Sequence, residues 1–369
     1  MYRAGIVGLP NVGKSSLFNA LIKNHHAEVQ NYPFCTIDPN VGIVNLQDER
    51  LEKLAKIVKT NKIVPAAFEF VDIAGLVKGA SQGEGLGNKF LSHVREVDAL
   101  VHVVRCFNDP NITHVASSID PLRDIEIINT ELILSDLQSI ERKIDSVAKL
   151  AKGNDKQSKH ELAILEKIYK TLNDGNPARS LLNKDIAKED IPFYNSLFLL
   201  SDKPIIYAAN VLDTELSNEE TNQHIKTVQE YAKKTNARCI TMCAKLGLDM
   251  VEFSKEEEEG FIKDLGITDT GINNLIKETF DLLGLMTFFT AGEKEARAWT
   301  ILKNTKAPQA AGKIHTDFEK GFIKAEVINY EDLIKLGSKA VVREAGLARL
   351  EGKDYTVQDG DVIEFKFNV

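Results

Sequence analysis

Cysteines and long apolar runs are both scarce in this sequence, and each shortage excludes a class of protein. Cys35, Cys106, Cys239 and Cys243 are too few and too scattered for a disulfide framework, and they lack the paired spacing of a zinc site. No apolar run approaches the roughly 20 residues that a membrane-spanning helix needs, so we expect no membrane partner. The residues before the first apolar run leave no room for a cleaved signal, which favours a cytoplasmic protein with reduced thiols. The net charge of −8 argues against indiscriminate nucleic-acid binding by the whole molecule.

The hydrophobic pattern of the first third is typical of an α/β domain. Short β-type runs alternate with helical stretches over residues 3–129, which predicts a mostly parallel sheet wrapped by helices. At 369 residues the chain is longer than one hydrophobic core usually organises, so further domains are expected. The predicted strands of this sheet cover residues 4–7, 41–44, 67–71 and 99–104, and strand-like runs return at 204–209 and 239–242.

Two other patterns interrupt and follow the α/β domain. Apolar residues step by four and three from Ile133 to Ala151 and again from Leu162 to Leu172, which predicts an antiparallel coiled-coil hairpin. An ordinary pair of core-packing helices fits the same spacing. Strand-like and helical runs after Leu283 predict a small mixed α+β module. The expected division is a first domain over residues 1–282, a helical insertion within it at 130–200, and a C-terminal module at 283–367.

Residues 8–15 read G-L-P-N-V-G-K-S, which is the phosphate-binding pattern G-x-x-x-x-G-K-[ST]. The segment lies between a strand-like run and a helical stretch, as this pattern requires. Gly8 and Gly13 let backbone N–H groups turn inward around an anion, and the helix start adds its positive dipole end. We expect Lys14 to reach the β- and γ-phosphates of a nucleoside triphosphate and Ser15 to ligate Mg²⁺. The predicted nucleotide-binding loop comprises Gly8, Asn11, Val12, Gly13, Lys14, Ser15 and Ser16.

Partners for the metal and the γ-phosphate recur at workable positions. Asp72 follows a predicted strand, where its carboxylate can hold the Mg²⁺ shell, through water, and Gly75 can offer its N–H to the γ-phosphate. Thr36 lies in a loop upstream, and its hydroxyl can complete the metal shell and order the loop as a switch. Two later segments, 210–213 and 243–245, follow predicted strands where base-reading loops are expected, and they supply Asn210, Val211 and Asp213.

These motifs together resemble the Obg-like ATPase family, also called YchF. The resemblance rests on the phosphate loop, Thr36, D-I-A-G at 72–75, the glycine-rich run at 78–87 and T-F-F-T-A-G-E-K-E at 287–295. It covers essentially the whole chain. It implies a P-loop NTPase of the TRAFAC class, with a Ras-like nucleotide domain, a coiled-coil insertion and a C-terminal TGS domain of β-grasp-like fold. It also implies a cytosolic ATPase associated with the ribosome, and we expect the large subunit as partner.

The base-reading segment departs from both common patterns. A typical GTPase has N-K-x-D, and here Val211 replaces the lysine while Asp213 keeps the carboxylate that pairs with guanine. The family it resembles is associated with ATP and usually has Glu at this last position. We predict ATP, with the Val211 backbone contacting the adenine edge. A GTP-preferring enzyme of the same fold stays open as the alternative.

Hydrolysis is expected to be slow. Ras-like enzymes orient the attacking water with a Gln directly after D-x-x-G, and this chain has Leu76 there. The candidates for replacing that glutamine are His114, on a loop after a predicted strand, and a K⁺ ion coordinated through Asn11. An idle exposed histidine is the alternative for His114. The resemblance also implies a link to redox control, and Cys35 lies beside Thr36, but a buried thiol without a redox role is the favoured explanation.

Two functions of different kinds fit the motifs. The first is a nucleotide-dependent switch, in which the γ-phosphate orders the loops at Thr36 and Gly75. The second is an RNA- or ribosome-binding adaptor whose nucleotide site is mainly structural. A metabolite kinase fits less well, because no acceptor pocket is evident. Under either of the first two functions, basic residues of the insertion and the C-terminal module can contact phosphates, with a solubilising role as the alternative for each: Lys143, Lys149, Lys152, Lys156, Lys159, Lys313, Lys320, Lys324 and Arg343.

Overall fold

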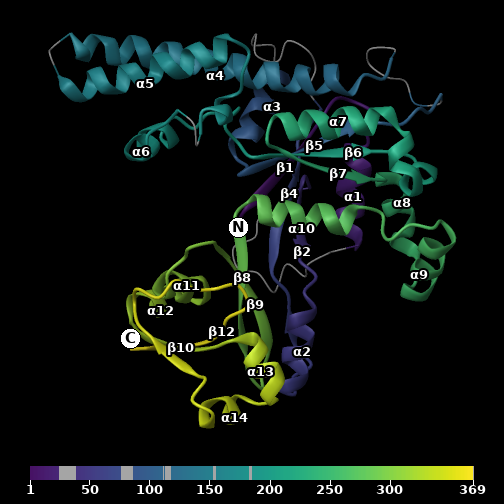
Figure 1. The fold of residues 1–369 in the computed structure, drawn as a ribbon, viewed down its shortest axis with the longest axis vertical. Coiled ribbons are helices and arrows are strands. Elements are labelled where there is room, and N and C mark those ends of the chain that lie inside the picture. Colours follow the sequence, from purple (N-terminus) through teal and green to yellow (C-terminus); the bar gives the residue numbers. More distant parts are fainter. Residues whose placement is uncertain are drawn as a thin grey trace.

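The protein has two sheets and a projecting helical arm (Figure 1). The structure is a computed structural model that describes residues 1–24, 39–75, 86–110, 112, 118–152, 155–182 and 185–368. The predicted α/β fold class, with its inserted helical hairpin and its C-terminal α+β module, is confirmed. Within these residues, no helix combines the length and the apolar character needed to cross a membrane.

The first sheet carries the phosphate-binding loop. Its strands run in the order β2-β4-β1-β5-β6-β7, and all neighbours are parallel except β2, which is antiparallel to β4. The strands are β2 (Val41–Asn45), β4 (Ala67–Asp72), β1 (Arg3–Val7), β5 (Ala99–Arg105), β6 (Ile205–Asn210) and β7 (Arg238–Met242). The interior strands β5 and β6 are buried along their whole length, which explains why they form continuous apolar runs in the sequence.

Helices cover both faces of this sheet. In Figure 1 the strands β5, β6 and β7 pass between α7 and α10. The helices of this part are α1 (Lys14–Asn24), α3 (Leu86–Arg95), α7 (Gln223–Lys234), α8 (Ala244–Asp249), α9 (Lys255–Asp264) and α10 (Ile272–Leu282), with 3-10 turns at Asp213–Thr221 and Met250–Glu252. Because every parallel strand ends at the same edge of the sheet, the loops after β1, β4, β5, β6 and β7 can meet there.

The helical arm is built from α4 (Pro121–Ala151) and α5 (Lys156–Asn173). Asp120 caps α4 by accepting a hydrogen bond from the Arg123 N–H at 3.1 Å, and Pro121 takes the first helical position. The first turns of α4 pack on the sheet, whereas its second half and α5 share a separate apolar core. The core residues of the hairpin include Ile140, Val147, Leu165, Ile168 and Leu172. Short turns at Ala178–Ser180 and Lys188–Asp190 and helix α6 (Ile191–Asn195) return the chain to β6.

The second sheet has the order β11-β10-β12-β8-β9-β3. Its strands are β11 (Arg349–Glu351), β10 (Phe322–Ile328), β12 (Val362–Phe367), β8 (Leu285–Ala291), β9 (Ala296–Leu302) and β3 (Ile63–Val64), and its helices are α11 (Ala307–Ile314), α12 (Thr316–Lys320), α13 (Tyr330–Leu336) and α14 (Lys339–Glu344). Strand β3 comes from the segment between β2 and β4, as does α2 (Glu49–Ile57). Leu51 and Leu54 of α2 are buried in one core with Phe289 and Leu333. The C-terminal sheet is therefore completed by residues from the first part of the chain.

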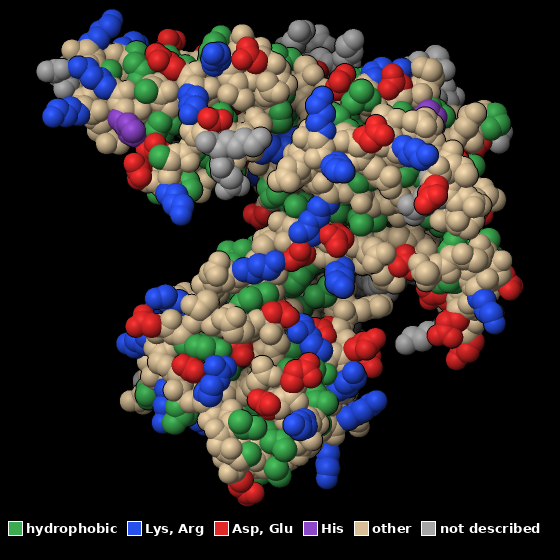
Figure 2. All heavy atoms as spheres, viewed as in Figure 1, with side chains coloured by type: hydrophobic (Ala, Val, Ile, Leu, Met, Phe, Trp, Pro, Cys, Tyr) green, Lys and Arg blue, Asp and Glu red, His purple; other side chains and the backbone are tan. Residues whose placement is uncertain are grey.

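The arm and the C-terminal module both extend from the nucleotide-binding part, and the space-filling view shows a wide gap between them (Figure 2). Lys and Arg side chains gather at the free end of the arm in this view. The lysines nearest the hairpin turn are exposed: Lys149, Lys152, Lys156 and Lys159. A second contact joins the module to the N-terminus, because Lys313 on α11 places its Nζ 5.2 Å from the centre of the Tyr2 ring.

Candidate functional site

The phosphate-binding loop joins β1 to α1 and has the backbone geometry of an anion-binding turn. Gly8 and Gly13 adopt φ values of +153° and +101°, and Asn11 between them has φ +62°. A Cβ atom on Gly13 would collide with the side-chain amide of Asn210, so both the conformation and the space require glycine. Ser15 and Ser16 lie in the first turn of α1, and Ser15 is exposed.

Lys14 is buried at the centre of this loop. Its Nζ donates a hydrogen bond to the Leu9 carbonyl at 2.7 Å. Gly75 lies against the same ammonium group, because a Cβ built on Gly75 would be 3.0 Å from Lys14 Nζ. Burial lowers the pKa of Lys14 to about 8, and attraction to Asp72 partly opposes this. Burial likewise raises the pKa of Asp72, and Lys14 opposes that shift. The structure thus brings together three residues predicted from two separate motifs, the phosphate loop and the D-I-A-G segment.

The oxygen donors beside Lys14 suit a magnesium ion bound together with a phosphate chain. Ser15 offers a hydroxyl at the start of α1, and Asp72 offers a carboxylate at the end of β4. Over the described part of the chain, no cluster of three or more His, Cys, Asp or Glu side chains could hold a metal by itself. Mg²⁺ fits such a sparse donor set, because it usually keeps several waters and binds one or two protein groups plus substrate phosphates.

Asn210 ties three loops together. Its Nδ2 donates to the Val12 carbonyl at 2.9 Å, and its Oδ1 accepts a hydrogen bond from the Ala244 N–H at 3.0 Å. The side chain is buried, with 4% of its surface exposed. Val211 follows it with its N–H bound to the Met242 carbonyl at 3.0 Å. The asparagine predicted as a base-reading residue therefore also fixes the phosphate loop against the loop that starts α8.

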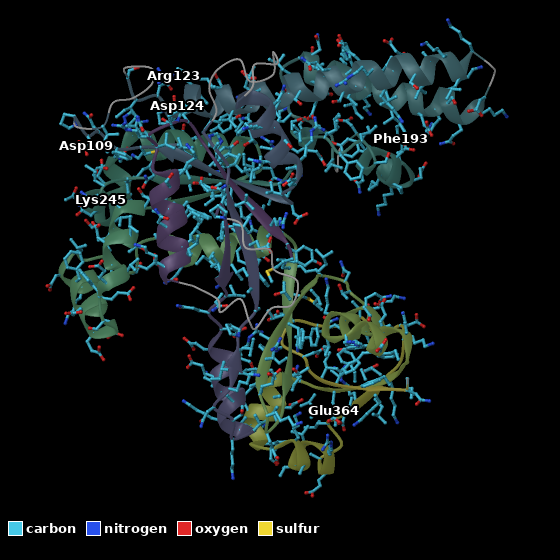
Figure 3. All side chains as sticks on the ribbon, turned by 180° about the vertical axis from the view of Figure 1, so that it is seen from behind. Asp109, Arg123, Asp124, Phe193, Lys245 and Glu364 are labelled. Atoms are coloured by element: carbon cyan, nitrogen blue, oxygen red, sulfur yellow. The ribbon has the colours of Figure 1, made fainter. Side chains whose placement is uncertain are left out.

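A cavity of about 440 Å³ opens beside the phosphate loop. Its lining includes Asn11, Gly13 and Ser16 of the phosphate loop, which are close neighbours of Lys14 in the chain. Asp109 and Lys245, which also line it, lie on the same side of the nucleotide-binding part in Figure 3. The remaining wall contains both predicted base-reading segments and a third loop: Phe107, Ile112, Asn210, Val211, Leu212, Asp213, Cys243, Ala244, Leu246 and Asp249.

The third loop was missed in the sequence. Phe107, Asp109 and Ile112 follow β5, and they line the cavity together with the two predicted segments. The available signal was the rule that loops at the carboxyl ends of parallel strands meet at one edge. In the sequence this rule predicts the base-reading segments after β6 and β7. For the loop after β5, only His114 is predicted from the sequence.

Several predicted residues lie outside the described residues. These are Thr36, Leu76, His114 and Cys35, and their roles remain predictions. The other cysteines are free thiols, and Cys106 and Cys243 are buried. Burial raises the pKa of both thiols, and the Cys243 sulfur accepts a hydrogen bond from the Leu246 N–H at 3.4 Å. These two cysteines are therefore protonated near neutral pH.

A phosphate loop after β1, a carboxylate at the end of β4 and a base-side cavity at the carboxyl edge of a mostly parallel sheet define a P-loop nucleoside triphosphatase. A family model described as "50S ribosome-binding GTPase" matches residues 3–167, and the model YchF-GTPase_C, described as "Protein of unknown function (DUF933)", matches residues 285–368. The chain belongs to the YchF family, which confirms the resemblance drawn from the motifs.

Relatives match along the entire chain. The "Ribosome-binding ATPase YchF" of Bacillus subtilis is 55% identical over 366 residues, which are 99% of this chain and 99% of that protein. The protein of the same description from Escherichia coli O157:H7 is 50% identical over 368 residues, covering 100% and 99%. The solved structure of the Schizosaccharomyces pombe YchF GTPase is 38% identical and superposes with a TM-score of 0.89 over 99% of this chain and 97% of that one.

Proposed function

We propose that this protein is a nucleotide-dependent switch that binds ATP with Mg²⁺, hydrolyses it slowly to ADP and phosphate, and binds the ribosome. The observation that carries the proposal is the meeting of Lys14, Asp72 and Gly75 at the phosphate loop, whose residues Asn11, Gly13 and Ser16 line a cavity shared with the base-side loops. Members of the family from several bacteria are described as ribosome-binding ATPases. A ribosomal partner would place the protein in the cytoplasm.

Each residue has a definite task in this proposal. The N–H groups of residues 8–15 surround the phosphates, and the Lys14 ammonium neutralises negative charge on the β- and γ-phosphates. Mg²⁺ would be held by Ser15, by Thr36 and, through water, by Asp72, and when bound it neutralises charge between the β- and γ-phosphates. Gly75 donates its N–H to the γ-phosphate. Loss of the γ-phosphate would release the Gly75 hydrogen bond and the Thr36 ligand. This release of two loops is the proposed switch.

The choice of base rests on the loop after β6. Because the Val211 N–H is bound to Met242, a base contact through this residue must use the carbonyl oxygen. A carbonyl accepts a hydrogen bond from the exocyclic amino group of adenine, whereas the corresponding atom of guanine is itself an acceptor. This favours ATP. Asp213 lines the same cavity and supports GTP as the alternative, since its carboxylate can pair with guanine.

The attacking water needs a group other than a glutamine. We propose His114 or a K⁺ ion held through Asn11 for this role. Lys14 would act on the transferred phosphoryl group, where positive charge stabilises the transition state. His114→Ala should reduce turnover and leave nucleotide affinity intact, and unchanged turnover would remove His114 from the mechanism. The same assay with Cys35→Ser tests the redox role, because only that role predicts that an oxidant changes the turnover of the wild type and not that of the variant.

The partner surfaces are proposed on the arm and the C-terminal module. We assign residues 1–282 to the nucleotide-binding domain, 130–200 to the coiled-coil insertion and 283–367 to a TGS domain. The exposed lysines at the free end of the arm can contact RNA phosphates. The family model described as a 50S ribosome-binding GTPase favours the large subunit.

Lys14→Ala separates the switch from an adaptor whose nucleotide site is only structural. As a switch, the variant should lose turnover and any ATP-dependent change in co-sedimentation with ribosomes. If the protein is an adaptor, the variant should co-sediment with ribosomes to the same extent as the wild type does in the presence of ATP. The affinities and turnover rates for ATP and GTP, measured with and without ribosomes and K⁺, test both the nucleotide preference and the role of K⁺. Clearly tighter binding of GTP than ATP would reverse the choice of base.

A further inference from the structure

The loop that closes the base side of the cavity is held by one buried side chain, Arg105, the last residue of β5. Only 1% of its surface is exposed. Its Nε donates to the Phe107 carbonyl at 3.2 Å, and its Nη2 donates to the carbonyls of Asp109 at 3.3 Å and Ile112 at 3.1 Å. Phe107, Asp109 and Ile112 are the described residues of this loop that line the cavity. One guanidinium group therefore bonds all three of them.

The guanidinium also supports the Phe107 ring. The Cζ atom of Arg105 lies 4.6 Å from the centre of that ring, within the range of a cation–π contact. A planar fork with several N–H groups can bond three carbonyls and lie against a ring at once. A lysine ammonium on a flexible stem cannot reproduce this arrangement.

Burying Arg105 costs folding free energy, so stability alone does not explain an arginine at this position. A buried guanidinium is tolerated when its N–H groups all find acceptors, and Arg105 Nη1 finds none among the residues that the structure describes. Nearby negative charge comes from Asp109 and from Asp124 on the first turn of α4, both labelled in Figure 3. A hydrophobic residue at position 105 would avoid the cost but would leave the three loop carbonyls without these donors.

The three base-side loops are fixed by different means. Asn210 binds both the phosphate loop and the loop before α8. The loop after β5 is attached at its first residue, where the Cys106 N–H donates to the Asn210 carbonyl at 2.9 Å. Beyond Cys106, its cavity-lining residues are bonded by Arg105. Removing this side chain should therefore move one wall of the base pocket and leave the phosphate loop in place.

We propose that Arg105 is a positioning residue for the nucleobase: by bonding the backbone carbonyls of Phe107, Asp109 and Ile112, it sets the affinity of the site for the nucleoside part of the ligand. The inference rests on the proposed function of the nucleotide site. Within the described residues, the hydrogen bonds of Arg105 go to the loop after β5 and not to the phosphate loop, Ser15 or Asp72. Arg105 therefore affects a ligand that has a base and not one that consists of phosphates alone.

Arg105→Lys tests this with two probes, ATP and inorganic triphosphate, each with Mg²⁺. We expect the Kd and the KM for ATP to rise about tenfold while kcat changes less than about twofold and the Kd for triphosphate stays unchanged. Arg238→Lys is the matched control, because Arg238 on β7 bonds Glu278 and Asp281 away from the cavity. It should bind both probes as the wild type does. Arg105→Gln replaces Arg105→Lys if thermal unfolding shows that the lysine variant does not fold.

Wild-type affinity for ATP in the variant would overturn the inference. So would an equal loss of affinity for ATP and triphosphate, because that would indicate general damage to the site. A wild-type protein that binds neither probe would instead overturn the proposed function, so the two failures are distinguishable.

Discussion

Arg50 on α2 donates a hydrogen bond to Asp359, 309 positions later in the chain, with 2.7 Å between Nη1 and Oδ2. Its Nη2 donates to Thr287 Oγ1 at 3.0 Å, and its guanidinium lies 5.1 Å from the centre of the Phe289 ring. Helix α2 lies in the chain between the loop of Thr36 and the strand that ends at Asp72. The segment that joins two proposed Mg²⁺ ligands, Thr36 and Asp72, is thus built into the C-terminal module.

Replacing Arg50 tests how strongly this contact joins the two parts. Arg50→Lys should lower the free energy of unfolding by about 1–2 kcal/mol, because lysine cannot bond Asp48, Asp359 and Thr287 together. Urea denaturation gives the value. Arg343→Lys is the control, since Arg343 pairs with Glu326 and Glu364 within the C-terminal module and is 45% exposed, against 31% for Arg50. We expect less than about 1 kcal/mol there, and equal losses would contradict the distinction.

Asn210→Ala should damage both stability and nucleotide binding. The change leaves the Val12 carbonyl and the Ala244 N–H without their buried partner, which costs about 2–3 kcal/mol. Because the phosphate loop and the loop before α8 are then no longer joined, the Kd for ATP should rise at least about tenfold. Asn218→Ala, on an exposed 3-10 turn, should change neither quantity. Calorimetric titration with ATP and thermal unfolding provide the two measurements, and unaltered ATP affinity in Asn210→Ala would show that the bridge is only structural.

Much of the fold could be predicted from the sequence because its signals are local. Strands β1 and β5 are buried on both faces and so form continuous apolar runs, and the arm repeats apolar residues such as Val147 and Leu165 at coiled-coil spacing. The phosphate loop is readable because its backbone geometry requires Gly13. These features depend on neighbours in the sequence.

The parts that could not be predicted depend on partners far away in the chain. Strand β3 has only two residues, which is too short for an alternating hydrophobic pattern. The sequence therefore does not predict that Ile63 pairs with Ala296. The sequence of α2 predicts an amphipathic helix with one apolar face, but it does not predict that this face packs on Phe289. Arg105 has the same difficulty, because an arginine at the end of a strand is expected at the surface until the following loop folds over it.

Asp136 anchors the return of the arm to the sheet, and its replacement should be costly. One carboxylate oxygen accepts from the Leu200 N–H and the other from the Ser201 N–H, both at 2.8 Å, and the side chain is buried. Asp136→Asn keeps the shape but offers only one acceptor atom, so its amide N–H₂ group must face a backbone N–H. The free energy of unfolding should fall by about 2–3 kcal/mol. Asp145→Asn, on a solvated position of the same helix, should have no measurable effect on urea denaturation.

The pKa of Lys14 predicts that ATP affinity falls in alkaline solution. Burial places this pKa at about 8 in the free protein. Phosphates bind the protonated ammonium more tightly than the neutral amine. Above pH 8, binding of ATP is therefore coupled to the uptake of a proton from solution by Lys14. Below pH 8 the group is already charged and affinity should not depend on it. Above pH 8 the Kd should rise, approaching about tenfold per pH unit, until the higher pKa of the complex is reached.

Calorimetric titration of ATP from about pH 7 to about pH 9, in buffers of different ionisation enthalpy, measures both the Kd and the proton uptake. AMP is the matched ligand, because it has the same base and lacks the β- and γ-phosphates that Lys14 is proposed to contact. Its affinity should stay flat over the same range. If ATP affinity were equally flat, Lys14 would either keep its charge throughout or lie away from the phosphates. A parallel fall for ATP and AMP would instead point to a titrating group on the base side of the cavity.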